Sequence, residues 1–173
     1  MKKWMSLLLS ALLLVAPCAV ADTTVALNEI YDALDMTLSL PDGMTVTQTP
    51  LAIGTSGAVE VAGQETLKIV FALTPDDSYA DMTLEQLTAE EVKTIFGLAL
   101  EDLENGKYET KPNSNGVLIL TMENGGKTEY IHLALNKGYF FYMEAFHEDF
   151  SPLTDAECAI ADSIVDTLAV IEK

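Results

Sequence analysis

Arginine is absent from this 173-residue chain, and all nine of its basic residues are lysines. Twenty-seven aspartates and glutamates oppose them, which gives a formal net charge of −18. A surface this negative repels phosphate backbones and anionic membrane surfaces. The chain also lacks the forked guanidinium group that binds phosphate and carboxylate at two points. These absences predict no nucleic-acid partner, and they argue against an enzyme that acts on anionic substrates.

Cysteine is also scarce, because Cys18 and Cys158 are the two in the chain. Cys18 lies in an N-terminal apolar segment with the pattern of a leader, so Cys158 has no partner for an internal disulfide. The fold must then depend on its hydrophobic core. A catalytic thiol needs a nearby base and an exposed setting. Cys158 lies instead in DAECAIADSIV, where the spacing predicts a small residue on a buried helix face.

Motifs for common enzyme and metal chemistry are missing. There is no phosphate-binding loop, no G-x-S-x-G, no H-E-x-x-H and no cysteine pair with metal spacing. The acidic segment 74–86 lacks the central glycine and spaced ligands of a calcium loop. His147, Glu148 and Asp149 are consecutive, so a strand would splay them, and a solvated loop is expected. The sequence predicts no catalytic residue, no metal site, no cofactor and no enzyme.

The N-terminus has the pattern of a secretory signal peptide. Two lysines precede an apolar run at Leu7–Ala16, and Ala19-Val20-Ala21 follows as an A-x-A site. The run is shorter than the roughly 20 residues of a membrane span. The sequence therefore predicts a signal peptide over 1–21 and a single globular domain over 22–173. The domain is expected to be secreted or periplasmic, with no membrane span; an uncleaved anchor is the alternative.

Several segments have the composition and alternation of strands. They are 34–40, 66–73, 116–122, 127–135 and 139–146, with 107–111 as a further candidate. Turns rich in asparagine and glycine separate the segments 116–122, 127–135 and 139–146, and they predict an antiparallel meander of three strands. Pro41-Asp42-Gly43 ends the first strand in a turn. Segment 47–63 is too weakly patterned to give strand limits, and Leu27–Leu34 fits a short helix.

Two longer segments predict helices that cover a sheet. Segments 82–106 and 154–171 carry apolar stripes at helical spacing, and each includes a capping box of the form Thr-x-x-Glu. The predicted strands are apolar on both faces, which means that both sides of the sheet need cover. The expected fold is of the α+β class: an antiparallel β-sheet with helices on both faces, an α/β/α sandwich.

The order of these elements resembles that of the PsbP-like superfamily. The resemblance rests on a strand ending in SLPDGM, a central helix, an antiparallel meander and a final helix IADSIVDTL. It covers most of 22–173, although the expected N-terminal helix departs from the family pattern. That superfamily includes extrinsic photosystem subunits, nuclear-transport cofactors and bacterial envelope proteins. The resemblance implies an α/β/α sandwich and a non-enzymatic interaction module, and it transfers no site residue.

One group of polar residues stands out in the last hairpin. If Asn136-Lys137-Gly138 forms a three-residue turn, then Tyr130, His132, Tyr142 and Glu144 share one face. A histidine with a carboxylate and two phenols could be an acid–base pair or a ligand platform. The alternative, a structural hydrogen-bonded cluster with pairs worth roughly 0.2–1 kcal/mol each, is favoured. It is favoured because no nucleophile or oxyanion donor can be placed beside the group.

These observations predict an acidic, non-catalytic, extracytoplasmic domain that interacts with a protein or an envelope component, as a monomer. The alternative is a module that binds a small ligand or a divalent cation through Tyr130, His132, Tyr142 and Glu144. A hydrolase is a third hypothesis, and it requires turnover that disappears when His132 or Glu144 is replaced by alanine.

Cleavage between Ala21 and Asp22 can be tested through tryptophan. Trp4 is the only tryptophan of the chain, and it precedes the predicted cleavage site. The exported protein should therefore show no indole fluorescence, and N-terminal sequencing should begin at Asp22. An exported form that retains indole emission would contradict the prediction.

Overall fold

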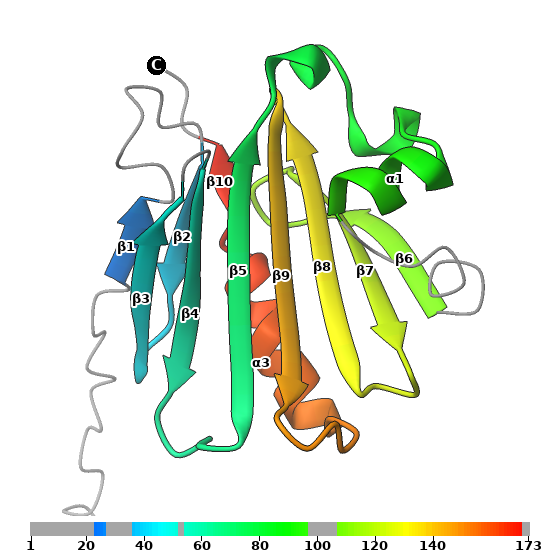
Figure 1. Ribbon diagram of the computed structural model, residues 1–173. Coiled ribbons are helices and arrows are strands. Elements are labelled where there is room, and N and C mark those ends of the chain that lie inside the picture. The colour runs from blue at the N-terminus through cyan, green and yellow to red at the C-terminus, as the bar shows by residue number, and fades with distance from the viewer. Residues whose placement is uncertain (1–22, 27–35, 52–53, 97–106, 171–173) are drawn as a thin grey trace, which may run out of the picture.

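Strands dominate the computed structural model, which describes residues 23–26, 36–51, 54–96 and 107–170 (Figure 1). This part holds ten strands, two α-helices and two 3₁₀ turns. The strands are β1 (Thr23–Ala26), β2 (Met36–Leu40), β3 (Met44–Pro50), β4 (Thr55–Val61), β5 (Leu67–Pro75), β6 (Lys107–Pro112), β7 (Leu118–Asn124), β8 (Glu129–Asn136), β9 (Tyr139–His147) and β10 (Ala169–Val170). The helices are α1 (Ala89–Phe96) and α3 (Asp155–Val165), and the 3₁₀ turns are η1 (Asp77–Tyr79) and η2 (Leu84–Gln86).

Seven strands form one antiparallel sheet in the order β3-β4-β5-β9-β8-β7-β6. The predicted meander of three strands is confirmed, because β7 pairs with β8 and β8 pairs with β9. The predicted strand 107–111 is also confirmed as β6, which forms the edge next to β7. In the centre, β5 pairs with β9 along nine residues of each strand. This long-range pairing joins the first half of the chain to the meander.

A smaller sheet of order β1-β2-β10 lies beside the large one. The expected strand end and turn at Pro41–Gly43 are confirmed, and Gly43 has the positive φ of 80° that the turn uses. The turn carries the chain from β2 in the small sheet to β3 in the large sheet. The chain returns to the small sheet at its other end, where β10 pairs with β2.

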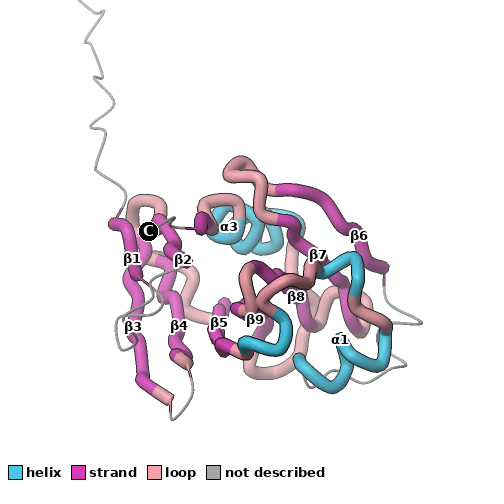
Figure 2. The backbone as a smooth tube through the Cα atoms, turned by 90° about the horizontal axis from the view of Figure 1, so that it is seen from above, coloured by secondary structure: helices cyan, strands magenta, loops and turns pink. Residues whose placement is uncertain are grey.

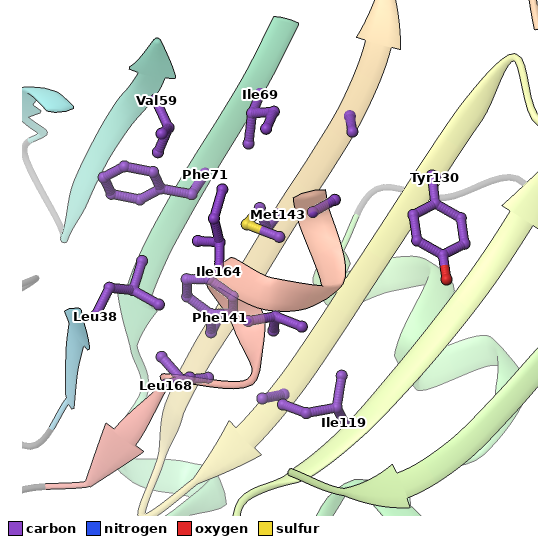
Figure 3. Close-up of a cluster of buried hydrophobic side chains, with 14 of the residues drawn as sticks. Leu38, Val59, Ile69, Phe71, Ile119, Tyr130, Phe141, Met143, Ile164 and Leu168 are labelled. Carbon is purple, nitrogen blue, oxygen red and sulfur yellow. The ribbon is translucent and has the colours of Figure 1, made fainter. Parts of the chain in front are cut away.

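The main core lies between the large sheet, α3 and the small sheet (Figures 2 and 3). Figure 3 shows Ile164 of α3 directed toward Phe141 of β9, with Leu38 and Leu168 alongside. Ile164 and Phe141 are both 0% exposed. The opposite face carries two smaller apolar clusters, in which Val92 of α1 packs with Ile131. These clusters cover the corner of the sheet formed by β7, β8 and β9.

The expected α/β/α sandwich with helices on both faces is wrong. The two described α-helices have only eight and eleven residues, whereas the large sheet has seven strands. The small sheet shares the covering of one face with α3, and a short helix with 3₁₀ turns covers one corner of the other. The protein is a β-rich, mostly antiparallel fold. The α/β/α architecture that the PsbP-like resemblance implied is therefore corrected as well.

Three local differences explain why the protein has more strand and less helix than the sequence predicted. Segment 47–63 contains most of the β3–β4 hairpin, whose small and β-branched residues hid its alternation. Within the segment 82–106 that was predicted to be helical, the α-helix begins at Ala89, after η2. The helix predicted to reach 171 ends at Val165, where the chain turns into β10. The expected helix at 27–34 and the end of the helix predicted over 82–106 lie outside the described residues.

Both predicted capping boxes are confirmed. The backbone N–H of Thr154 donates to Glu157 Oε2 over 2.8 Å, and Thr88 makes the same bond to Glu91 over 2.7 Å. At the other end of α3, Asn113 Nδ2 donates to the carbonyls of Val165 and Leu168 over 3.0 and 2.8 Å. Side chains therefore satisfy the backbone groups that α3 leaves open at both ends. No helix among the described residues is long and apolar enough to span a membrane.

Replacing Ile164 with aspartate should unfold the domain. Ile164 is 0% exposed in the main core, and the substitution would bury an unpaired carboxylate. Changes of this class destabilise by more than about 4 kcal/mol. Thermal unfolding followed by far-UV circular dichroism should show loss of the cooperative transition. Ala156→Asp, which adds the same charge at an exposed position of α3, should melt as the wild type does; an unchanged Ile164→Asp transition would contradict the packing.

Candidate functional site

The turn between β8 and β9 decides which side chains can meet. It is a two-residue turn of Lys137 and Gly138, with φ of 49° and 78°, and Asn136 pairs with Tyr139. Two central residues with positive φ are the mark of a type I′ turn, whose twist matches the strands. A Cβ at position 138 would lie 2.7 Å from the carbonyl oxygen of Asp76. Glycine is therefore required there by the backbone angle and by the close approach.

This turn overturns the expected four-residue face. The expected three-residue turn placed His132 opposite Tyr142, but His132 pairs with Met143, and Tyr130 pairs with Ala145. A register shift of one residue moves a side chain to the other face of the sheet. Tyr130 and His132 therefore face α3, whereas Tyr142 and Glu144 lie on the opposite face. The assignment of these four residues to ligand binding stays a prediction, but they do not form one platform.

Tyr130 and His132 meet a third residue, Asp162 of α3. The hydroxyl of Tyr130 donates to Asp162 Oδ1 over 3.0 Å, and His132 Nε2 lies 3.0 Å from the same oxygen. The rings of Tyr130 and His132 contact each other edge to face, with centroids 4.8 Å apart. His132 is 0% exposed, and its Nδ1 has no hydrogen-bond partner among the described residues. Asp162 was not predicted as a site residue, although a carboxylate on a helix predicted to pack on this sheet was the available signal.

Hydrogen bonds fix the charge of this cluster. Burial alone would raise the pKa of Asp162, but the hydrogen bonds from His132 and Tyr130 hold that pKa below its usual value. Burial, together with the negative charge of Asp162, raises the pKa of Tyr130. At neutral pH, Asp162 is therefore a carboxylate and Tyr130 a neutral hydrogen-bond donor.

A hollow of about 290 Å³ lies next to Asp162, between α3 and the β6–β7 edge of the sheet. Its walls include Pro112, Ile119, Ala159 and Val165, which supply apolar surface, and Lys111 and Asp166, which supply charge. Both hydrogen bonds to Asp162 end on Oδ1, so Oδ2 has no partner within the described part of the chain. The hollow therefore combines apolar walls with an oriented carboxylate.

Tyr142 and Glu144 form a separate pair on the face that carries α1. The hydroxyl of Tyr142 donates to Glu144 Oε2 over 2.6 Å. Burial and the nearby charge of Glu129 raise the pKa of Glu144, although the hydrogen bond from Tyr142 opposes that rise. Burial also raises the pKa of Tyr142. Tyr142 packs beside the apolar cluster of this face, so the pair has the surroundings of a structural hydrogen bond.

A serine, a histidine and an acid meet at the start of α3. His147 Nδ1 lies 2.9 Å from Ser151 Oγ, and His147 Nε2 lies 2.9 Å from Glu157 Oε1. The sequence reading expected a solvated loop here, and Glu148 and Asp149 are indeed exposed. His147 differs, because its side chain is only 12% exposed. Serine, histidine and an acid are also the residue types of a hydrolase triad, which in addition requires hydrogen-bond donors for the oxyanion.

Among the described residues, the backbone N–H groups next to Ser151 are already in use. Its own backbone N–H donates to Asp149 Oδ1 over 3.0 Å, and the next residue is Pro152, which has no N–H. The N–H of Phe150 donates to the carbonyl of His147 over 2.9 Å. Acyl transfer relies on free donors for the developing oxyanion. The hydrogen bonds of Ser151, His147 and Glu157 join the end of β9 to the N-terminus of α3.

Metal and thiol chemistry have little support in the described residues. Among them, no group of three His, Cys, Asp or Glu side chains is arranged to hold a metal ion. Cys158 is 7% exposed on α3, and burial raises the pKa of its thiol. The predicted buried helix position of Cys158 is confirmed.

Glu144→Gln should stabilise the domain at neutral pH. The folded state raises the pKa of Glu144, so its ionisation costs stability once the pH exceeds the unfolded value of about 4.3. Glutamine removes that cost and can still accept the hydrogen bond from Tyr142. The melting temperature of the variant should exceed that of the wild type at pH 7, and the difference should shrink as the pH falls toward 4. The exposed substitution Glu60→Gln is the control; a variant that is less stable at pH 7 would contradict the assignment.

Comparison with known proteins gives no family for this chain. No family model and no curated protein matches it. A crystal structure of a protein from Bacteroides thetaiotaomicron VPI-5482 is similar over 88% of this chain, with a TM-score of 0.48 and 8% sequence identity. The match covers 49% of that protein, so this chain spans about half of its length. This likeness assigns neither a site nor a function, and the PsbP-like resemblance stays a prediction.

Proposed function

We propose that this chain is a non-catalytic interaction domain that binds a basic surface of a protein or an envelope component. The proposal rests on the observation that both described histidines, His132 and His147, form hydrogen bonds that hold α3 on the large sheet. His132 is hydrogen-bonded to Asp162, and His147 to Glu157, so each histidine ties the large sheet to α3. The side chains best suited to acid–base catalysis are thus engaged in holding the fold together.

The distribution of charge supports a basic partner. Between β5 and α1, exposed carboxylates follow one another along η1, η2 and the start of α1. They belong to Asp76, Asp77, Asp81, Glu85 and Glu90. In the full chain, 27 acidic residues face nine lysines, so the whole molecule also produces a negative field. Such a field accelerates encounters with a positively charged surface and repels negatively charged ones.

The proposed compartment is based on the signal-peptide pattern at the N-terminus. With residues 1–21 removed as a signal peptide, the domain would meet its partner outside the cytoplasm, in a secreted or periplasmic setting. A monomer fits the strong net charge, because two copies of so acidic a chain repel each other. A ligand platform made of Tyr130, His132, Tyr142 and Glu144 together is not proposed, since two of these residues lie on each face of the sheet.

The proposal predicts a salt-dependent association rate. A partner captured from an envelope fraction should bind more slowly as sodium chloride rises from about 50 to 500 mM, by about tenfold or more. A variant with Asp77→Asn, Asp81→Asn and Glu85→Gln should associate more slowly at low salt. Asp42→Asn, Glu60→Gln and Glu65→Gln together remove the same charge from exposed positions elsewhere and should have a smaller effect. Stopped-flow or surface-based kinetics can measure both.

Two outcomes would count against the proposal. An association rate that does not change with salt would show that the acidic surface does not steer the partner. Turnover of a p-nitrophenyl ester that disappears in Ser151→Ala would show that the array of Ser151, His147 and Glu157 is catalytic.

A further inference from the structure

The hollow beside Asp162 combines the features of a small binding site. Ile119 and Val165 are 3% and 5% exposed, so the apolar walls belong to the packed core and are held in place. Its volume of about 290 Å³ is just below the roughly 300–1,000 Å³ range of small-ligand sites. The hollow therefore fits a short chain of atoms better than an extended ligand.

Asp162 is held in one orientation at the wall of this hollow. Tyr130 and His132, which both come from β8, each contact Oδ1, and this leaves Oδ2 as the acceptor that the protein does not use. His132 is fully buried and Tyr130 is 9% exposed, so the core fixes both of these neighbours. A carboxylate positioned in this way needs little reorganisation when it accepts a further hydrogen bond.

The other charged groups of the hollow are engaged. Ser114 donates its backbone N–H to Asp166 Oδ1 over 2.9 Å, and its hydroxyl donates to Asp166 Oδ2. Lys111 forms an ion pair with Glu109 over 3.4 Å, and 64% of its side chain is exposed; its charge also lowers the pKa of Asp162 and of Asp166. Asp162 Oδ2 is therefore the open charged acceptor among the described residues of the hollow. Two carboxylates against one lysine at this wall disfavour an anionic ligand.

We propose that this hollow binds a primary ammonium group on an alkyl chain, namely a lysine side chain of the basic partner. The inference rests on the proposed function and adds the group that is recognised. The alkyl stem would pack on Pro112, Ile119 and Val165, and the ammonium would donate to Asp162 Oδ2. An arginine fork is less suitable, because it donates to two carboxylate oxygens and Oδ1 already accepts two hydrogen bonds.

Titration with n-butylammonium, followed by amide chemical shifts, tests this inference on the purified chain. Saturable shifts should be concentrated at residues that line the hollow. The same titration with n-butanol and with butyrate separates the ammonium from its alkyl chain and from an anion. Equal binding of n-butanol would show an apolar hollow without charge recognition and would overturn the inference. Absence of saturable shifts with n-butylammonium would overturn it as well.

Two variants locate the interaction. Asp162→Asn should weaken n-butylammonium binding by about tenfold or more, because a hydrogen bond to a charged group is lost. Asp155→Asn removes the same charge from α3 at a residue outside the hollow and should leave binding unchanged. Ala159→Leu keeps Asp162 and fills the hollow from an exposed helix position, so it should also abolish binding. Binding that survives both Asp162→Asn and Ala159→Leu would overturn the inference.

The inference and the proposed function can fail separately. The salt dependence of the association rate tests whether a basic partner is steered to the domain, and the n-butylammonium titration tests the hollow alone. With a captured partner, Asp162→Asn should raise the dissociation rate by about tenfold, while the salt dependence of association is retained. An unchanged dissociation rate would place the partner elsewhere on the domain and would overturn the lysine assignment.

Discussion

The two-residue turn at Lys137–Gly138 is the constraint on which the arrangement of polar groups depends. Because side chains alternate along a strand, this turn sets which residues of β8 lie on the same face as which residues of β9. Backbone contact reinforces the choice, since the N–H of Asp76 donates to the carbonyl of Gly138 over 2.7 Å. A three-residue turn would exchange the faces along one of the two strands. His132 and Tyr142 would then share one face, whereas here His132 meets Asp162 on one face and Tyr142 bonds Glu144 on the other.

Given this register, α3 is attached to the sheet by polar bonds as well as by apolar packing. Ile164 and Leu168 fill the core, while His132 and His147 reach Asp162 and Glu157 at separate turns of the helix. Buried polar groups cost stability when they are left unpaired, so these bonds favour one position of the helix over others. That specificity explains how a short helix of eleven residues is fixed on a large sheet.

The sequence was a good guide to local structure and a poor one to what meets across the sheet. Strands such as 139–146 and the box at Thr154 have signals that lie within a few residues, and both were predicted. The site depended on one turn: Asn136 was counted as part of the loop because asparagine tolerates positive φ, yet it belongs to β8. Asp162 was missed because its partners lie about 30 residues away in sequence. Only the packing of α3 brings them together.

The same bonds that fix α3 also shape what the surface can recognise. By occupying Asp162 Oδ1, Tyr130 and His132 leave Oδ2 of this carboxylate as an acceptor at the wall of the hollow. The net charge of the chain acts over a range set by ionic screening, of about 8 Å at physiological salt, and does not distinguish one cation from another. A single oriented oxygen acts only at contact and does distinguish, because it favours a point donor over a fork. Long-range attraction and local selection are therefore separate properties here, and the local one derives from residues that the fold itself requires.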